Sequence, residues 1–332
     1  MLSSIRPMSV KNRRWSSGWN VVTWVWRRVT VVALAGLAIS TPLFWRWLSE
    51  HDAELMHGSR VESTAKGDVE VALVGEGIPI LQLHGSPGGY DQSVGGRGER
   101  PGSSKRQTIA ISRPGYLRTP LASGHTPAEQ ADLFAALLDV LQVPRVVVQG
   151  SSAGSYSAIQ FALRHPNRMI ALILYAPDLG SHPNGGRFTG NLMEDYGRWI
   201  VTTPPIFTLA GPLMARGLDI HDDSAREGLR RLIRSTIPAS LHSAGRQNDL
   251  EQRVNPDIDQ WPVEQIHVPT LIVHGTRDEN TSYTRSVEFA KRVPGAKLVS
   301  IEGGDHLVSF TRPEEASSAI DQFLDALPEA RR

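Results

Sequence analysis

Residues 146–162 read VVVQGSSAGSYSAIQFA and join a buried strand to a helix through a turn of very small residues. Three valines lead into the pentad GSSAG (150–154), and small and apolar residues follow at once. A sharp turn from strand to helix forces its corner residue into strained backbone angles, and glycines two positions away on either side avoid collision with neighbouring backbone. The pentad therefore predicts that Ser152 stands at this corner with its hydroxyl above the sheet.

Similar apolar runs recur after residue 68 and alternate with helical ones. Their nearly continuous apolar character is typical of strands in a parallel sheet that is covered on both faces. Thr126 and Glu129 form a capping-box pattern at the start of one helix. The predicted strands cover residues 69–75, 78–85, 107–115, 145–152, 169–177, 269–275 and 297–304, and the helices cover 126–143, 153–166, 282–293 and 313–327. This alternation predicts an α/β fold with a doubly wound, mostly parallel sheet.

The alternation of strands and helices is interrupted once, and this interruption separates the predicted domains. No strand pattern is visible from residue 180 to about 268, and a helical pattern lies near residues 223–237. We predict an N-terminal segment (1–48), a polar linker (49–68), a core in two parts (69–179 and 267–332) and a helical cap (180–266) inserted between them.

The N-terminal segment contains about 17 uncharged residues, 29–45, at the short end of a membrane-spanning helix. Arginines precede this stretch and tryptophans flank it on both sides, an arrangement that suits a membrane interface. The first fifty residues carry seven basic side chains against one acidic one, a charge of +6 that leaves −5 for the remainder of a chain whose total is +1. This excess predicts a single-pass anchor in the cell membrane with the body outside the cytoplasm. A cleaved signal, releasing the body after the small-residue site at 38–40, and a buried helix are the alternatives.

Composition excludes several classes of chemistry. The chain has no cysteine, which excludes disulfides, thiolate metal sites and a cysteine nucleophile. Its small total charge does not favour binding to nucleic acid. The sequence contains no metal-ligand cluster, phosphate-binding loop or dinucleotide fingerprint, since the glycines at 95–98 lack a strand before them. We therefore predict no metal and no cofactor, and a small-molecule substrate.

A serine hydroxyl needs a base to become a good nucleophile, and the loops after the last two strands offer one. His306 follows the last predicted strand and Asp278 the one before it. Both loops lie at the carboxyl ends of strands, where open α/β sheets bind ligands. We expect His306 to accept the proton of Ser152 and Asp278 to orient the imidazole. An ordinary loop histidine and a turn aspartate are the alternatives, and Asp178, which follows another strand, is a second candidate acid.

Backbone N–H groups are expected to stabilise the oxyanion. The helix after the pentad directs its N-terminal amides toward Ser152, so Ala153 is one predicted donor. The segment His84–Gly89 follows an early strand, and Ser86 is the second predicted donor.

These motifs together resemble the α/β-hydrolase superfamily, in particular its cap-bearing serine hydrolases such as proline iminopeptidases and haloperoxidase-like esterases. The resemblance covers roughly residues 69–327. It rests on His-Gly-x-Pro-Gly at His84, Arg-Pro-Gly-Tyr at Arg113, the Ser152 pentad, His-Gly-x-x-Asp at His274 and Gly-Asp-His at Gly304. It implies the roles already given for Ser152, His306, Asp278, Ser86 and Ala153.

Three positions depart from the family pattern. Ser112 replaces an aspartate and Leu117 replaces a glycine, which we expect to alter loop support. Ala153 stands where iminopeptidases commonly have tryptophan, which weakens the peptidase interpretation.

The resemblance implies a serine hydrolase that cleaves a carboxylic ester through an acyl-enzyme. An amide-cleaving aminopeptidase and a non-catalytic binding protein are the alternatives. Two groups of cap residues bear on the substrate. Apolar residues that could line an acyl pocket, at least half of which we expect to form the cap's own core instead, are Trp199, Ile200, Val201, Ile206, Phe207, Leu209, Leu213 and Met214. Acidic residues that could hold a substrate ammonium, although we expect a solvated surface position for them, are Glu194, Asp195, Asp222 and Asp223.

Overall fold

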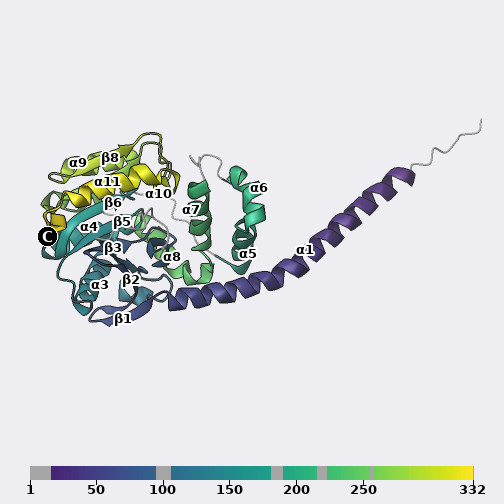
Figure 1. The fold of residues 1–332 in the computed structure, drawn as a ribbon, viewed down its shortest axis with the longest axis horizontal. Coiled ribbons are helices and arrows are strands. Elements are labelled where there is room, and N and C mark those ends of the chain that lie inside the picture. The colour runs from purple at the N-terminus through teal and green to yellow at the C-terminus, as the bar shows by residue number, and fades with distance from the viewer. Residues whose placement is uncertain (1–15, 95–105, 181–189, 215–222, 255–257, 332) are drawn as a thin grey trace, which may run out of the picture. The chain divides into compact units, whose positions relative to one another are not determined.

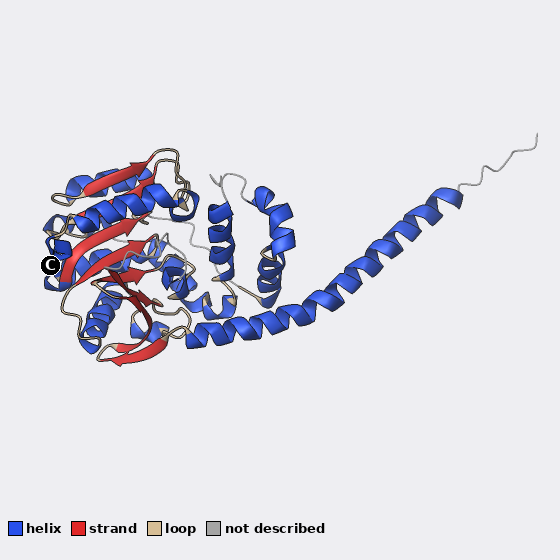
Figure 2. Cartoon of the chain, viewed as in Figure 1, coloured by secondary structure: helices blue, strands red, loops and turns tan. Residues whose placement is uncertain are grey.

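The computed structural model describes residues 16–94, 106–180, 190–214, 223–254 and 258–331. Two compact units make up the chain, Met1–Asp52 and Ala53–Arg332. The first contains most of helix α1 (Ser16–His57), and the second contains the sheet, its covering helices and the cap (Figures 1 and 2).

The sheet has eight strands in the order β1-β2-β4-β3-β5-β6-β7-β8. Their bounds are β1 Arg60–Thr64, β2 Gly67–Gly75, β3 Ile78–Leu83, β4 Arg106–Ile111, β5 Val146–Ser151, β6 Met169–Tyr175, β7 Thr270–Gly275 and β8 Lys297–Ile301. All neighbours from β4 to β8 are parallel, whereas β2 is antiparallel to both β1 and β4. The predicted doubly wound, mostly parallel sheet is confirmed.

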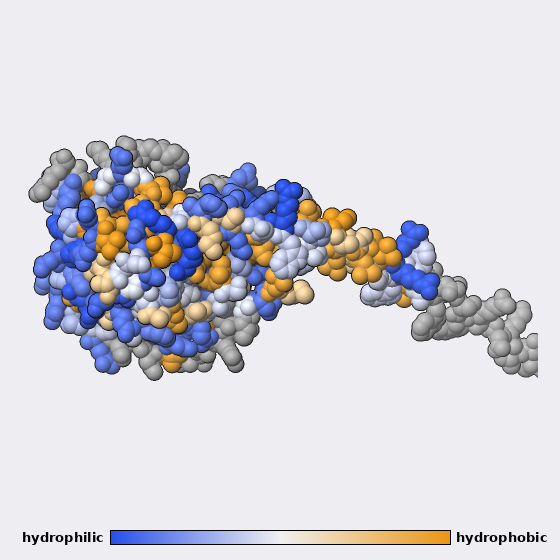
Figure 3. Space-filling model, turned by 90° about the horizontal axis from the view of Figure 1, so that it is seen from below, coloured by the Kyte–Doolittle hydropathy of each residue, from blue (hydrophilic) through white to orange (hydrophobic). Residues whose placement is uncertain are grey.

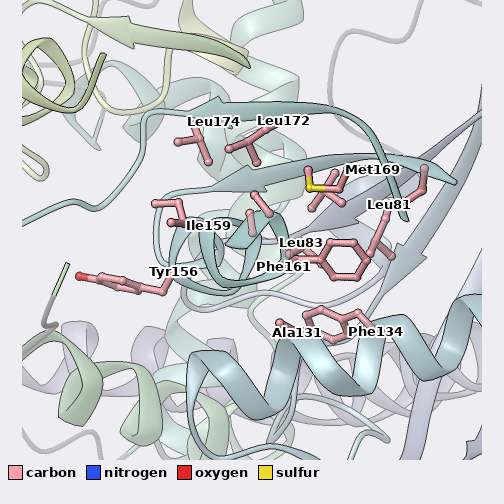
Figure 4. Close-up of a cluster of buried hydrophobic side chains, with 14 of the residues drawn as sticks. Leu81, Leu83, Ala131, Phe134, Tyr156, Ile159, Phe161, Met169, Leu172 and Leu174 are labelled. Atoms are coloured by element: carbon pink, nitrogen blue, oxygen red, sulfur yellow. The ribbon is translucent and has the colours of Figure 1, made fainter. Parts of the chain in front are cut away.

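Helices cover both faces of this sheet, and the alternation of side chains along β5 shows how. Val146 and Val148 belong to the core cluster that includes α3 (Pro127–Val140), α4 (Gly154–Arg164) and α9 (Tyr283–Arg292), part of which Figure 4 shows. Val147 belongs to the cluster on the other face, which α10 (Val308–Thr311) and α11 (Pro313–Asp325) cover. Because both faces are buried, the inner strands are mostly apolar on both sides, and their sequences are nearly continuous apolar runs.

The edge of the sheet near the N-terminus differs from the sequence expectation. The sequence analysis predicts a linker over residues 49–68, but α1 continues to His57 and β1 follows it as an edge strand. The β1 sequence RVEST is mostly exposed and therefore lacks the apolar pattern by which the inner strands are recognised. A short helix, α2 (Asp91–Val94), packs near this edge through Val94, beside the preceding residue Tyr90.

The cap lies in the chain between β6 and β7 and is helical in its described parts, as the sequence predicts. It contains α5 (Leu192–Val201), α6 (Pro204–Met214), α7 (Asp223–Arg234) and α8 (Ser243–Val254). A buried ion pair joins α8 to the core. The Arg113 guanidinium donates to both carboxylate oxygens of Asp249, at 2.8 and 2.6 Å, and the two side chains are 1% and 2% exposed.

The loop after β4 carries two of the residues that depart from the family pattern. Ser112, which replaces an aspartate of the family pattern, donates a hydrogen bond to Glu70 Oε2 at 2.7 Å. The carboxylate in this loop region therefore belongs to Glu70 of β2. Leu117 has φ 47°, in the left-handed region that favours glycine. Its amide donates to the Leu241 carbonyl in the cap at 2.8 Å, which helps to hold this conformation.

The Arg113–Asp249 pair provides a test of how the cap is held. Asp249→Ala leaves a buried guanidinium without its carboxylate, and we expect the free energy of unfolding to fall by about 3–5 kcal/mol. Denaturant unfolding measures this change. Glu251→Gln, at an exposed position of the same helix, is the control and should change it by less than about 0.5 kcal/mol. Equal stability of the two variants would contradict the role of the pair.

Candidate active site

The turn between β5 and α4 places Ser152 above the sheet, and its two glycines are sterically required. Ser152 has φ 47°. A Cβ on Gly150 would lie 2.7 Å from Ala158 Cβ, and a Cβ on Gly154 would lie 2.7 Å from the His84 carbonyl oxygen. Such contacts are closer than packed atoms tolerate. The glycines therefore allow α4 to start directly behind Ser152 and against the end of β3.

Three side chains meet at this point. His306 Nε2 lies 3.1 Å from Ser152 Oγ, and His306 Nδ1 lies 2.7 Å from Asp278 Oδ2. An ionised carboxylate can only accept hydrogen bonds, so Nδ1 donates to Asp278 and Nε2 is left to accept the serine proton. The structure thus brings together the predicted nucleophile, base and acid from the ends of β5, β8 and β7.

Asp278 is a fully buried carboxylate with several donors. Its Oδ2 accepts from Thr281 Oγ1 at 2.8 Å and lies 2.9 Å from His274 Nε2. Its Oδ1 accepts from the amides of Asn280 and Thr281 at 2.8 and 2.9 Å. Burial by itself would raise the pKa of Asp278, but the hydrogen bonds from His274 and His306 outweigh it and hold this pKa well below its usual range. Asp278 is therefore an anion at neutral pH. It both accepts the turn amides of Asn280 and Thr281 and contacts His306.

Asp305, the residue before His306, holds the loop that carries this histidine. Asp305 Oδ1 accepts from the Leu307 amide at 2.8 Å and from Thr311 Oγ1 at 3.0 Å. The aspartate of the Gly-Asp-His motif thus holds the loop, and His306 itself is 16% exposed and faces the site.

The predicted oxyanion donors lie on either side of Ser152. Ala153 precedes the first turn of α4, and a Cβ on Gly85 would lie 3.3 Å from Ser152 Cβ, so the Gly85–Ser86 backbone is in close contact with the nucleophile. In the described part of the chain, neither the Ser86 nor the Ala153 amide donates to a backbone carbonyl. Both amides are consistent with the predicted role.

Arg113 holds the loop that contains Ser86. Its guanidinium donates to the carbonyls of His84 and Gly85 at 2.8 and 3.2 Å, besides binding Asp249. Tyr116 donates to Asp249 and its hydroxyl lies 3.0 Å from Ser86 Oγ. The position of this loop therefore depends on the cap.

Asp178, the second candidate acid, lies elsewhere. Its carboxylate pairs with Arg253 of α8 at 2.6 Å, and its amide donates to the Ser152 carbonyl at 3.2 Å. It is buried and takes part in attaching the cap, whereas Asp278 contacts His306.

A cavity of about 310 Å³ opens over Ser152. Its floor includes Gly85, Ser86, Ser152 and His306, and its walls come from the cap and from the segment around α10. The wall residues are Arg198, Leu232, Ile233, Thr236, Arg246, Leu307, Ser309 and Phe310.

The apolar wall differs from the one expected. None of the six candidate apolar residues whose side chains the structure describes is in the cavity lining. Trp199 and Phe207 are buried, Leu209 is 84% exposed, and the side chains of Leu213 and Met214 lie outside the described residues. Leu232 and Ile233 of α7 are the apolar cap residues in the described lining.

The acidic residues proposed for an ammonium group are also placed elsewhere. Asp195 is 3% exposed and accepts from the Ala239 amide, Glu194 pairs with Arg198, and Asp223 is at the surface near Arg226. Asp222 lies outside the described residues.

Several residues of the site lack a role in the sequence analysis. Thr281 and His274 hold Asp278, and Arg246 lines the cavity. His274 stands in the quoted His-Gly-x-x-Asp motif, where its spacing from Asp278 was the available signal. No sequence pattern marks Asp249, because its partner Arg113 is 136 residues away.

Comparison with known proteins agrees with the observed fold. A model of the alpha/beta hydrolase family matches residues 83–319. The chain is 25% identical over 258 residues to 2-hydroxymuconate semialdehyde hydrolase from Pseudomonas putida, covering 75% of this chain and 88% of that protein. The solved alpha/beta hydrolase fold protein from Nakamurella multipartita matches with a TM-score of 0.68 and 28% identity over 80% of this chain and 98% of its own. A thermophilic esterase from Thermogutta terrifontis shares the fold, with a TM-score of 0.57 and 22% identity over 80% of this chain and 97% of its own.

The two candidate acids can be separated by matched substitutions. Asp278→Asn removes the anion that fixes the His306 tautomer, and we expect turnover to fall by about 10⁴-fold with little change in fold. Asp178→Asn weakens the ion pair with Arg253, so stability should fall more than turnover. Steady-state kinetics and thermal unfolding of both variants provide the measurement. A greater loss of turnover in Asp178→Asn would assign the acid to the earlier loop.

Proposed function

Because the chain belongs to the α/β-hydrolase family, we propose that it is a serine hydrolase that cleaves carboxylic esters of small molecules through an acyl-enzyme. The observation that carries the proposal is the relay from Ser152 through His306 to buried Asp278 at the floor of a cavity. Its hydrolase relatives support the reaction class.

Acylation begins when Ser152 Oγ attacks the ester carbonyl. His306 Nε2 accepts the hydroxyl proton, and Asp278 stabilises the imidazolium that forms. The carbonyl oxygen becomes an oxyanion within reach of the Ser86 and Ala153 amides, each of which is expected to contribute on the order of 10²–10³ in rate. Collapse of the intermediate expels the alcohol, which takes the proton from His306.

Deacylation repeats the same proton movements with water. His306 removes a proton from the water that attacks the acyl carbon, and Ser152 recovers that proton as it leaves. The products are one carboxylic acid and one alcohol.

The aminopeptidase alternative is less well supported. An aminopeptidase needs an acidic group near the nucleophile to hold the substrate ammonium. Among the described residues that line the cavity, no Asp or Glu is present, whereas two arginines are. This favours an ester over an aminoacyl amide.

We also propose that α1 anchors the chain in a membrane with the body outside the cytoplasm. The helix is the one described segment long and apolar enough to span a bilayer, with a mean hydropathy of 1.5 over its best window and 6% of that window buried. Val31, Val32 and Ile39 are each more than 60% exposed, and Figure 3 shows the apolar surface along this helix. Such exposure is costly in water and favourable in lipid.

Labelling with a fluorophosphonate probe tests the activated serine. We expect the wild type to be labelled, Ser152→Ala to be unlabelled, and its ester turnover to fall on the order of 10⁶-fold. Ser155→Ala, which removes a buried hydroxyl from the same helix, is the control and should still be labelled. A folded wild type that does not react would favour the non-catalytic alternative, and cleavage of aminoacyl amides in preference to esters would favour the aminopeptidase.

The absence of natural cysteines allows a clean test of the anchor. We expect the full-length chain to remain in the membrane fraction after alkaline extraction. A thiol introduced by Glu76→Cys, at an exposed position of the body, should react with an impermeant maleimide on spheroplasts, and Ser4→Cys should react only after lysis. A soluble chain whose mass shows cleavage near residues 38–40 would instead identify a signal peptide.

A further inference from the structure

Two arginines of the cap line the cavity that contains Ser152. Arg198 comes from α5 and Arg246 from α8, and no Asp or Glu lies among the described lining residues. The remaining walls near them are apolar, with Leu232, Ile233 and Phe310. Beside such apolar walls, an anionic group bound in the cavity would interact favourably with the two arginines.

The two arginines differ in their surroundings. Arg198 lies 3.3 Å from Glu194 and 3.9 Å from Asp195, both on its own helix, and donates weakly to Thr236. Burial lowers the pKa of Arg246, Tyr116 partly offsets this, and the like charge of Arg198 lowers it further. A guanidinium nevertheless remains protonated at neutral pH. The charged groups among the described lining residues are therefore positive. An anion bound near Arg198 and Arg246 would reduce the repulsion between them.

The backbone at Arg246 is held rigidly. The preceding residue, Gly245, donates its amide to the Gly115 carbonyl at 2.8 Å, and a Cβ there would collide with the Tyr116 ring. One turn later Asp249 binds Arg113, which also holds the loop of Ser86. The same contacts thus fix the nucleophile's surroundings and the start of α8, so Arg246 has a defined position relative to the reacting carbonyl.

We propose that this cavity selects esters that carry an anionic group, a carboxylate or a phosphate, and that Arg246, assisted by Arg198, binds that group while Ser152 attacks the ester. The inference rests on the hydrolase function proposed above and adds the substrate class. The planar fork of a guanidinium matches both kinds of oxyanion. The apolar walls accommodate a short hydrocarbon segment between the ester and the anion.

Pairs of esters that differ only in charge provide the test. For a carboxylate on the acyl side, monomethyl and dimethyl esters of dicarboxylic acids from succinate to suberate are compared. For a phosphate on the alcohol side, butyrylglycerol phosphate is compared with butyrylglycerol. We expect wild-type kcat/KM to be roughly 10- to 100-fold higher for the anionic member of at least one pair, as expected for a charge-assisted hydrogen bond. The pair that shows the preference identifies the anion and its side of the ester.

Substitutions at position 246 then assign the preference. Arg246→Gln should bring the ratio of kcat/KM values close to one, Arg246→Lys should retain part of it, and Arg246→Glu should reverse it. Arg230→Gln is the matched control. It removes a cap arginine that pairs with Glu227 and is outside the cavity lining, so it should leave the ratio unchanged. The rate of fluorophosphonate labelling reports whether each variant is folded around an active serine.

The outcomes separate this inference from the proposed function. A labelled wild type that shows no preference for either anion, or cleaves none of these esters, overturns the substrate class. A preference that survives in Arg246→Gln overturns the role of Arg246. If the folded wild type is not labelled at all, the hydrolase proposal fails and this inference fails with it.

Discussion

The turn at Ser152 is the constraint on which the rest of the site depends. It brings the first turn of α4 so close to the ends of β3 and β5 that only glycine fits at positions 150 and 154. The same approach places the Gly85–Ser86 backbone against the nucleophile. One steric condition therefore sets the direction of the serine hydroxyl, the orientation of the Ala153 amide and the position of the loop opposite.

Next to the turn at Ser152, the structure buries a charge, the carboxylate of Asp278. Asp278 is excluded from water and compensated by two imidazoles, a hydroxyl and two amides. A carboxylate with so many donors stays ionised and has little freedom to move. One of these donors is the Nδ1–H of His306. The hydrogen bond to Asp278 therefore also fixes the imidazole tautomer in which Nε2 faces Ser152.

The cap is part of the same polar system. Arg113 binds Asp249 of the cap and, with the other side of its guanidinium, the carbonyls of the loop that carries Ser86. Arg253 binds Asp178, whose amide in turn donates to the Ser152 carbonyl. The contacts of α8 thus support Ser152 and the Gly85–Ser86 loop, and the same helix contributes Arg246 to the cavity lining. If the proposals above hold, one helix links the geometry of the reacting groups to the recognition of the substrate's charge.

The sequence by itself determined the sheet, the capped helix at Thr126 and the residues that meet at the site, because each of these depends on local pattern. Apolar runs, glycine spacing and positions after strands are visible without knowledge of the fold. The sequence missed the exposed strand β1, and it left open which apolar cap residues line the cavity and which form the cap's own core. Which face of a cap helix turns inward depends on packing against segments more than a hundred residues away. The ion pair of Arg113 with Asp249, the pairing of Asp178 with Arg253 and the arginines at the cavity were decided only by tertiary structure, because charge and shape complementarity act between surfaces that the chain order does not place together.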